Sequence, residues 1–224
     1  MANRWLVLET SGRFGQVGVG AEDCLVEAVS LDASRQHARD LLPAIHSLLK
    51  RRDWKVGDLT GIAVSIGPGS YTGLRIGIMA AKAIAYATGC AVAAVPTFAV
   101  FAHQSTAIGN TLEVVADALK GRLYCQTFER TLSSGEWSPT SQLRVAPVAE
   151  CTNRWTPESV IVGPGAAMVR GPGAGSDTYA DTAAQLRSVL ALGMSGRYQC
   201  ADVFALEPLY VLPSSAEEQW QRRG

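Results

Sequence analysis

The sequence predicts an α/β fold built of two lobes, each with a mixed sheet flanked by helices. Across residues 1–105, short apolar runs of strand length alternate with longer segments of helical periodicity. The same alternation restarts more weakly after Gly109. The chain has 224 residues, which is enough to bury a core in one large domain or two small ones. We therefore expect a first lobe at residues 1–105 and a second, smaller and more irregular lobe at residues 106–224.

The first lobe is expected to open with three consecutive strands. Residues 5–9 form an apolar run, residues 11–15 supply a glycine turn, and residues 16–20 return as the second strand of a hairpin. Residues 24–31 read as a third strand. Later strands are expected at residues 62–66, where the run is continuous and apolar, and at residues 91–95.

Three helices are expected between and after these strands. Leu41, Leu42 and Ile45 fall at helical spacing, and Ser34 is the expected N-cap of their helix. Pro43 predicts a kink in that helix or marks its true first turn. The other two helices are expected at residues 72–88 and 96–107. The order of strands and helices resembles the ribonuclease-H-like unit, which actin-like proteins use twice.

The second lobe shows a weaker pattern. Strands are expected at residues 112–118 and 124–130, on either side of a turn that contains Lys-Gly-Arg. Residues 133–147 are expected to form a polar loop. A short strand at residues 160–163 and a helix at residues 182–192 complete the expected elements.

Composition limits the function classes. The chain is 47% hydrophobic and 18% charged, as is usual for a globular protein, and its formal net charge is zero. A protein that binds nucleic acid by itself usually has a basic face, so the balanced charge argues against RNA binding by this chain alone. The five cysteines include no CxxC pair, which predicts buried free thiols and neither a zinc site nor a disulfide framework.

We expect neither a secretion signal nor a membrane span. The opening MANRWLVLETSG has no long apolar region after Arg4. No stretch of the chain reaches the ~18 uncharged apolar residues of a membrane span.

A glycine-rich loop, GPGSYTG, stands between an expected strand and an expected helix. Free backbone amides at a helix N-terminus can hold a phosphate, and glycines let a ligand come close. The residues of this candidate phosphate loop are Gly67, Gly69, Ser70 and Thr72. Thr72 stands where the fingerprint GxGxxG needs its third glycine, and the P-loop pattern is also missing.

The helix after this loop carries small residues at every fourth position. The row consists of Gly69, Gly73, Gly77, Ala81, Ala85 and Gly89. Such a row lets another backbone approach closely, because the side chains that would separate the two are missing. The row could serve internal packing or the docking of a partner. Leu74, Ile78 and Met79 extend apolar character around the helix, which requires either burial or a partner.

The sequence indicates no catalytic residue and no metal site. His37 and His46 are nine residues apart, which puts them on opposite faces of an ideal helix, and His103 is remote from both. The patterns HExxH and GxSxG do not occur. Glu9 and Asp117 each end an expected strand, where two-lobed ATPases hold magnesium.

Four segments of the chain resemble the TsaB (YeaZ) family. The most specific is IAVSIGPGSYTGLRIGIMAAKAIAYATGCAVAAVPTFAVFA, at residues 62–102. The others are WLVLETSG, QHARDLLPAIHSLL and ADALKGRLY, at residues 5–12, 36–49 and 116–124. The resemblance covers residues 5–124. It departs from the usual pattern in three places, since Glu9, Tyr71 and Arg122 stand where an aspartate, a phenylalanine and an acidic residue are common.

The resemblance implies a noncatalytic subunit of the actin-like fold that binds and supports TsaD. TsaD transfers a threonylcarbamoyl group to N6 of adenosine 37 in tRNAs that read codons beginning with A. The implied partners are TsaD, as a heterodimer, and TsaE, with tRNA reached only through the complex. The chain alone could form a homodimer. No cofactor of its own is expected, ATP or ADP could bind at the TsaD–TsaE assembly, and the location would be cytoplasmic.

The resemblance also implies a partner interface on the two helices of the first lobe. Its expected residues are Leu41, Leu42, Ile45, Gly73, Leu74, Arg75, Gly77, Ile78, Ala81 and Lys82. In TsaD the helix after the fifth strand carries two metal-binding histidines, and the matching positions here are Thr97 and Phe101. Neither side chain can replace an imidazole ligand. An ATP-dependent kinase or ATPase of the same fold, and a metallopeptidase, remain as alternatives.

Overall fold

A computed structural model describes residues 3–31, 37–155, 159–169 and 183–211 of the chain. The chain divides into two compact units. The first unit comprises Met1–Val100 and Ala183–Pro208, and the second comprises Phe101–Thr182 and Leu209–Gly224. The division falls within α3 (Thr97–Gln104), close to the expected boundary at residue 105.

The first unit contains a five-stranded sheet in the order β3-β2-β1-β4-β5. Antiparallel pairing joins β1 to β2 and β2 to β3, while β4 is parallel to both β1 and β5. The five strands lie where the apolar runs predict them. Their bounds are Arg4–Glu9, Gln16–Ala21, Cys24–Ser30, Gly61–Gly67 and Ala91–Pro96 for β1 to β5.

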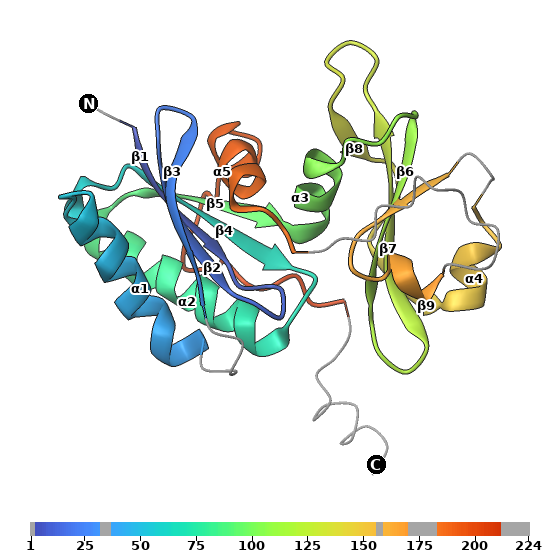
Figure 1. Cartoon of the computed structure of the whole chain (residues 1–224), viewed down its shortest axis with the longest axis horizontal. Coiled ribbons are helices and arrows are strands. Elements are labelled where there is room, and N and C mark those ends of the chain that lie inside the picture. The colour runs from blue at the N-terminus through green and yellow to red at the C-terminus, as the bar shows by residue number, and fades with distance from the viewer. Residues whose placement is uncertain (1–2, 32–36, 156–158, 170–182, 212–224) are drawn as a thin grey trace. The chain divides into compact units, whose positions relative to one another are not determined.

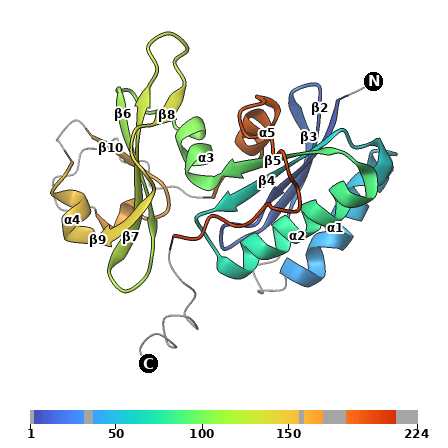
Figure 2. The same ribbon diagram turned by 180° about the vertical axis from the view of Figure 1, so that it is seen from behind.

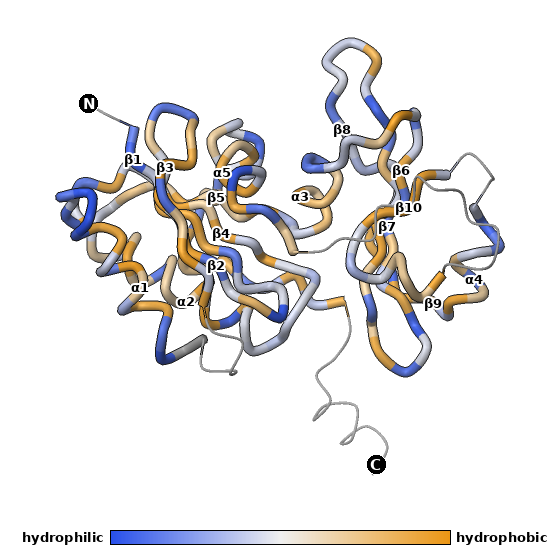
Figure 3. Tube along the Cα trace, in the orientation of Figure 1, coloured by the Kyte–Doolittle hydropathy of each residue, from blue (hydrophilic) through white to orange (hydrophobic). Residues whose placement is uncertain are grey.

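Two helices cover one face of this sheet. Figures 1 and 2 show α1 (His37–Arg51) and α2 (Tyr71–Thr88) side by side there. Pro43 lies inside α1, and the expected N-cap Ser34 lies outside the described residues. Along α1 the tube in Figure 3 carries both hydrophilic and hydrophobic colour, as expected for a helix with one face on the core. A short 3₁₀ turn, Val56–Asp58, precedes β4.

The other face of the first sheet is covered by α5 (Leu186–Met194). A Cβ atom on Gly20 would overlap the Leu190 side chain, and one on Gly193 would lie 2.6 Å from the Ala63 Cβ. Residues 183–208 were predicted to belong to the second lobe, and that prediction is wrong. The apolar side of the sheet needs a cover, and glycines on both partners let α5 lie close enough to supply it.

The second unit contains the sheet β10-β6-β7-β8, in which β9 also pairs with β7. The expected strands at its start are confirmed as β6 (Thr111–Asp117) and β7 (Arg122–Arg130). The expected polar loop at residues 133–147 is wrong, because it contains β8 (Trp137–Pro139) and β9 (Arg144–Pro147). The remaining elements are α4 (Val148–Thr152), β10 (Val160–Val162) and a 3₁₀ turn, Ala166–Met168.

The two units repeat one strand arrangement. In each, the first strand pairs antiparallel with the second and parallel with a later one, as in β1, β2 and β4 and again in β6, β7 and β10. The later strand runs into Gly-Pro-Gly in both, at residues 67–69 and 163–165. No helix in the described parts of the chain is both long and apolar enough to cross a membrane.

Candidate functional site

The candidate site of the first unit lies at the N-terminus of α2, where the glycine loop leads into the helix. The Ser70 side chain caps this helix by accepting a hydrogen bond from the Gly73 amide at 3.2 Å. The Ser70 amide donates to the Ser11 carbonyl at 2.7 Å, so the loop is tied to the chain that leaves β1. Gly89 ends the helix in the left-handed conformation that favours glycine.

The glycine row of α2 faces inward. A Cβ atom on Gly69, Gly73 or Gly77 would overlap atoms of Thr10 or Ser11, the two residues that follow β1. The row therefore lets the helix lie against the end of β1. This corrects the assignment of Gly73 and Gly77 to a docking surface, because their missing side chains serve internal packing.

The expected interface residues divide by burial. Seven of them are buried in this chain and take part in its core or its close packing: Leu41, Ile45, Gly73, Leu74, Gly77, Ile78 and Ala81. Leu42 is 59% exposed and Arg75 is also exposed. Lys82 is half-buried and its Nζ donates to the Phe204 carbonyl at 2.8 Å. Helical spacing predicted that these residues lie on two helices, but it did not distinguish the inner positions from the outer ones.

Two large exposed side chains of α2 are absent from the expected interface residues. Met79 is 61% exposed and Tyr86 is 78% exposed. The Tyr86 ring meets the Phe204 ring edge-on, with centroids 5.9 Å apart. We call Leu42, Met79 and Tyr86 the outer apolar positions. Met79 and Tyr86 could have been found from their spacing, because they follow Arg75 by about one and about three helical turns and so share its face of the helix.

An arginine and a tyrosine contact each other on the outer surface of α2, near its N-terminus. The Arg75 guanidinium donates to the Tyr71 hydroxyl at 2.7 Å and lies 5.3 Å from the centre of the Tyr71 ring. Tyr71 is 44% exposed. The hydroxyl that distinguishes this tyrosine from phenylalanine therefore orients the arginine on the surface of the helix.

Glu9 at the end of β1 is buried and hydrogen-bonded within the chain. One carboxylate oxygen accepts from the Ser11 amide at 2.7 Å and from the Ser11 hydroxyl at 2.5 Å, and the other accepts from the Ser65 hydroxyl. Burial raises the pKa of Glu9, and the bonds from Ser11 and Ser65 oppose that rise. Asp117 belongs to the second unit, where it is exposed and accepts from the Leu119 amide at 2.7 Å.

The candidate phosphate loop uses several of its amides internally. The Gly67 amide donates to the Thr97 hydroxyl at 3.1 Å, and the Ser70 and Gly73 amides have the internal acceptors described above. Gly69 packs against Ser11, whereas Thr72 is exposed. Internal packing thus accounts for this loop's glycine and serine without a ligand.

The positions matched to metal-binding histidines lie on α3. Thr97 and Phe101 are both buried. Burial lowers the pKa of His103, and the nearby Glu136 carboxylate partly opposes that effect. Within the described ranges, no three histidine, cysteine, aspartate or glutamate side chains gather closely enough to hold a metal ion.

Comparison with known proteins relates this geometry to one group. The family model described as "TsaD: tRNA N6-adenosine threonylcarbamoyltransferase" matches residues 29–138. The Bacillus subtilis (strain 168) tRNA threonylcarbamoyladenosine biosynthesis protein TsaB is 30% identical over 124 residues, 55% of this chain and 54% of that protein. The Escherichia coli (strain K12) protein of the same name is 30% identical over 105 residues, 46% and 45% of the two chains. The chain spans about half the length of the curated relatives it matches.

A solved structure extends the likeness to nearly the whole fold. YeaZ from Pseudomonas aeruginosa superposes with a TM-score of 0.75 over 93% of this chain and 99% of that one, at 22% sequence identity. This match agrees with the predicted actin-like, ribonuclease-H-like α/β fold. The chain is therefore similar in sequence to TsaB and TsaD proteins over about half of its length, and similar in fold to YeaZ over nearly all of it.

Proposed function

We propose that the chain is a noncatalytic subunit that binds and supports TsaD in the N6-threonylcarbamoylation of adenosine 37 of tRNA. The tRNAs would be those that read codons beginning with A, and they would be reached only through the complex. TsaE would join the same assembly. Because this tRNA modification takes place in the cytoplasm, the proposal places the chain there. Two relatives named for this biosynthesis and the match to the TsaD family support it.

The observation that carries the binding role is the set of outer apolar positions. Leu42, Met79 and Tyr86 each expose more than half of their side-chain surface on the two helices of the first unit. Large apolar side chains on a helix surface are typical anchors for a partner protein. The glycine row packs α2 closely against Thr10 and Ser11 at the end of β1, so Met79 and Tyr86 stand on a rigid helix.

The hydrogen bonds of Glu9, at the end of β1, support the noncatalytic role. The carboxylate of Glu9 already accepts hydrogen bonds on both oxygens from Ser11 and Ser65. Magnesium would have to compete with these buried bonds. The positions that match metal-binding histidines carry Thr97 and Phe101, which offer no comparable ligand.

Reconstitution tests the role directly. TsaC, TsaD and TsaE from the same source are mixed with tRNA, threonine, bicarbonate and ATP, with or without this chain. We expect modification of adenosine 37 to fall at least ~10-fold when the chain is left out, in keeping with the loss of one supporting interface. Undiminished modification without the chain would exclude the proposal.

An ATP-dependent kinase or ATPase of the actin-like fold is the alternative. The feature that favours it is the glycine loop at the N-terminus of α2, an 18-residue helix. Calorimetry of the isolated chain with ATP and Mg²⁺ separates the two functions. The alternative requires saturable heat, and our proposal predicts none. A metallopeptidase would require bound metal, which elemental analysis of the purified chain would detect.

A further inference from the structure

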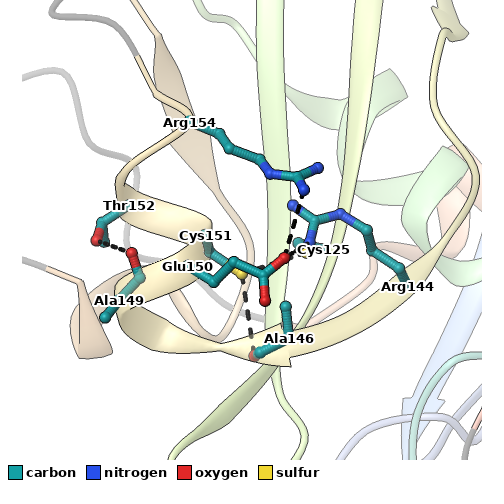
Figure 4. Close-up of polar contacts among 8 residues, drawn as sticks. All are labelled: Cys125, Arg144, Ala146, Ala149, Glu150, Cys151, Thr152 and Arg154. Atoms are coloured by element: carbon teal, nitrogen blue, oxygen red, sulfur yellow. Dashed lines mark hydrogen bonds and ion pairs between the residues drawn. The ribbon is translucent and has the colours of Figure 1, made fainter.

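Two buried cysteines contact each other in the second unit. The Cys151 thiol, on α4, donates to the Cys125 sulfur, on β7, and the two Sγ atoms are 3.3 Å apart (Figure 4). Both side chains belong to the core of this unit, where Cys125 is 2% exposed and Cys151 is 0% exposed. Cys151 Sγ also lies 4.0 Å from the carbonyl oxygen of Ala146, on β9.

The two sulfur atoms are a short movement away from bonding distance. A disulfide has its sulfurs about 2.05 Å apart, so the two Sγ atoms need to approach by only about 1.3 Å. The cysteines are 26 residues apart in sequence, and a bond between them would tie α4 to the middle of the sheet.

Burial keeps the pair unreactive while the unit is closed. It raises the pKa of the Cys125 thiol to about 12, with further contributions from its hydrogen bond to Cys151 and from the charge of that neighbour. The thiolate is the nucleophile, and a thiol with so high a pKa supplies almost none at neutral pH. Any reaction must therefore begin from a locally opened form.

α4 should open more easily than β7. It is a five-residue helix, whereas Cys125 pairs in the sheet with Val115 of β6 on one side and Arg144 of β9 on the other. Short single-turn helices open at lower free energy than strands paired on both sides. Opening α4 exposes Cys151 before it exposes Cys125.

One surface carboxylate links α4 to the sheet through an ion pair. Glu150 lies 3.2 Å from the Arg144 guanidinium of β9 and 3.4 Å from that of Arg154, as Figure 4 shows. The Glu150 side chain is 51% exposed, so these ion pairs are screened by solvent and contribute little each. The ion pairs of Glu150 therefore slow the opening of α4 only modestly.

We propose that Cys125 and Cys151 are a latent redox pair, which a hydroperoxide oxidises to an intramolecular disulfide when α4 opens. The Cys151 thiolate attacks a peroxide oxygen, the O–O bond breaks, and a sulfenic acid and hydroxide form. As α4 closes, the Cys125 sulfur attacks the Cys151 sulfur, the S–S bond forms, and the sulfenic oxygen leaves as hydroxide. The two thiol protons and two hydroxides make two waters, so hydrogen peroxide is reduced as the dithiol is oxidised. This pair lies in the second unit and is independent of the proposed docking helices.

Mass spectrometry of the full chain tests this pair. The reduced protein is treated with hydrogen peroxide, quenched with an alkylating reagent and digested without reductant. We expect a Cys125–Cys151 crosslink that lowers the mass by two hydrogens and forms at a rate independent of protein concentration. Cys24 is exposed and serves as the internal control for oxidant exposure. Complete oxidation of Cys24 with no Cys125–Cys151 bond, or preferred bonds to Cys24, Cys90 or Cys200, would overturn the proposal.

Two substitutions sharpen the test. Glu150→Gln removes these ion pairs and should speed crosslinking about 1.4- to five-fold, since an exposed ion pair of this kind stabilises by ~0.2–1 kcal/mol. Cys125→Ser should leave Cys151 as a sulfenic acid that dimedone traps. If Cys125→Ser gives no trapped Cys151 while Cys24 is oxidised, the assigned order of attack is wrong. The crosslink in the unsubstituted chain still decides the pairing itself.

Discussion

At the scale of single residues, Glu9 contributes to the way that stability responds to pH. Its pKa in the folded chain is raised by burial above the ordinary value of about 4.3. Folding therefore favours the protonated form. The stabilisation from protonated Glu9 is fully present below the unfolded-state pKa and is lost as the pH rises through the folded-state pKa. Above the folded-state pKa, Glu9 causes no further change in stability with pH.

The change Glu9→Gln tests this behaviour. Glutamine is neutral at all pH values and can keep one accepting oxygen among the same hydroxyls. We expect the variant to lose part of the decline in stability that the unsubstituted chain shows as the pH rises above about 4.3. Urea unfolding between pH 4 and pH 8 measures the difference. Parallel curves for the two proteins would show that Glu9 does not titrate across this window.

Gly77 tests the inward glycine row. A Cβ atom there would overlap the Thr10 side chain, so Gly77→Ala should cost about 1–3 kcal/mol of unfolding free energy despite the better helix propensity of alanine. Thr10→Ala should recover part of the loss, because it removes the overlapped hydroxyl. Gly57→Ala is the matched control, since a Cβ there meets nothing within 4 Å. Equal stability of the Gly77 and Gly57 variants would contradict the packing.

The sequence predicted some of these residues and not others. Glu9 is predictable, because an acidic residue that ends an apolar strand is visible in the pattern. Its partners Ser11 and Ser65 are not, because they come from the turn and from a different strand. The row of small residues is also visible, but both internal packing and docking fit it. Thr10 lies so close to Gly73 and Gly77 that these two glycines serve internal packing. That distance cannot be predicted from the sequence.

At the scale of elements, α5 is the part whose place was mispredicted. Its apolar spacing is evident, but periodicity does not tell which sheet a helix covers. The side chains of Leu186 and Leu190 pack against Gly18 and Gly20 on β2. These contacts join segments more than 160 residues apart in the sequence. β8 and β9 were missed because three- and four-residue strands in a polar segment give too few alternations to count.

Leu190 tests the packing of α5 on the first sheet. Its side chain is 1% exposed and lies over Gly20. Leu190→Ala should cost about 2–5 kcal/mol of unfolding free energy, as for other buried leucines. Leu192→Ala on the same helix should cost less, because Leu192 is only partly buried. Denaturant unfolding followed by circular dichroism gives both values, and a reversed order would show that α5 packs otherwise.

At the scale of the whole molecule, the pattern of strands and helices predicted the fold better than any single motif did. The expected α/β class with two mixed sheets is confirmed, and the strand arrangement of β1, β2 and β4 recurs in β6, β7 and β10. The glycine loop alone pointed toward phosphate binding. Only its surroundings showed that Gly69 and Ser70 also serve the packing of α2 on the end of β1.

The central claim is that the outer apolar positions bind TsaD, and calorimetric titration of TsaD with this chain tests it most directly. Met79→Asp places a charge on an exposed site, so folding should persist while TsaD affinity falls at least ~10-fold, as at interface anchors that contribute more than about 1.4 kcal/mol. Ile108→Asp is the matched control, because Ile108 is 97% exposed and lies in the second unit. We predict tight binding by the unsubstituted chain and by Ile108→Asp, and weak binding by Met79→Asp. Equal affinity of all three for TsaD would contradict the claim.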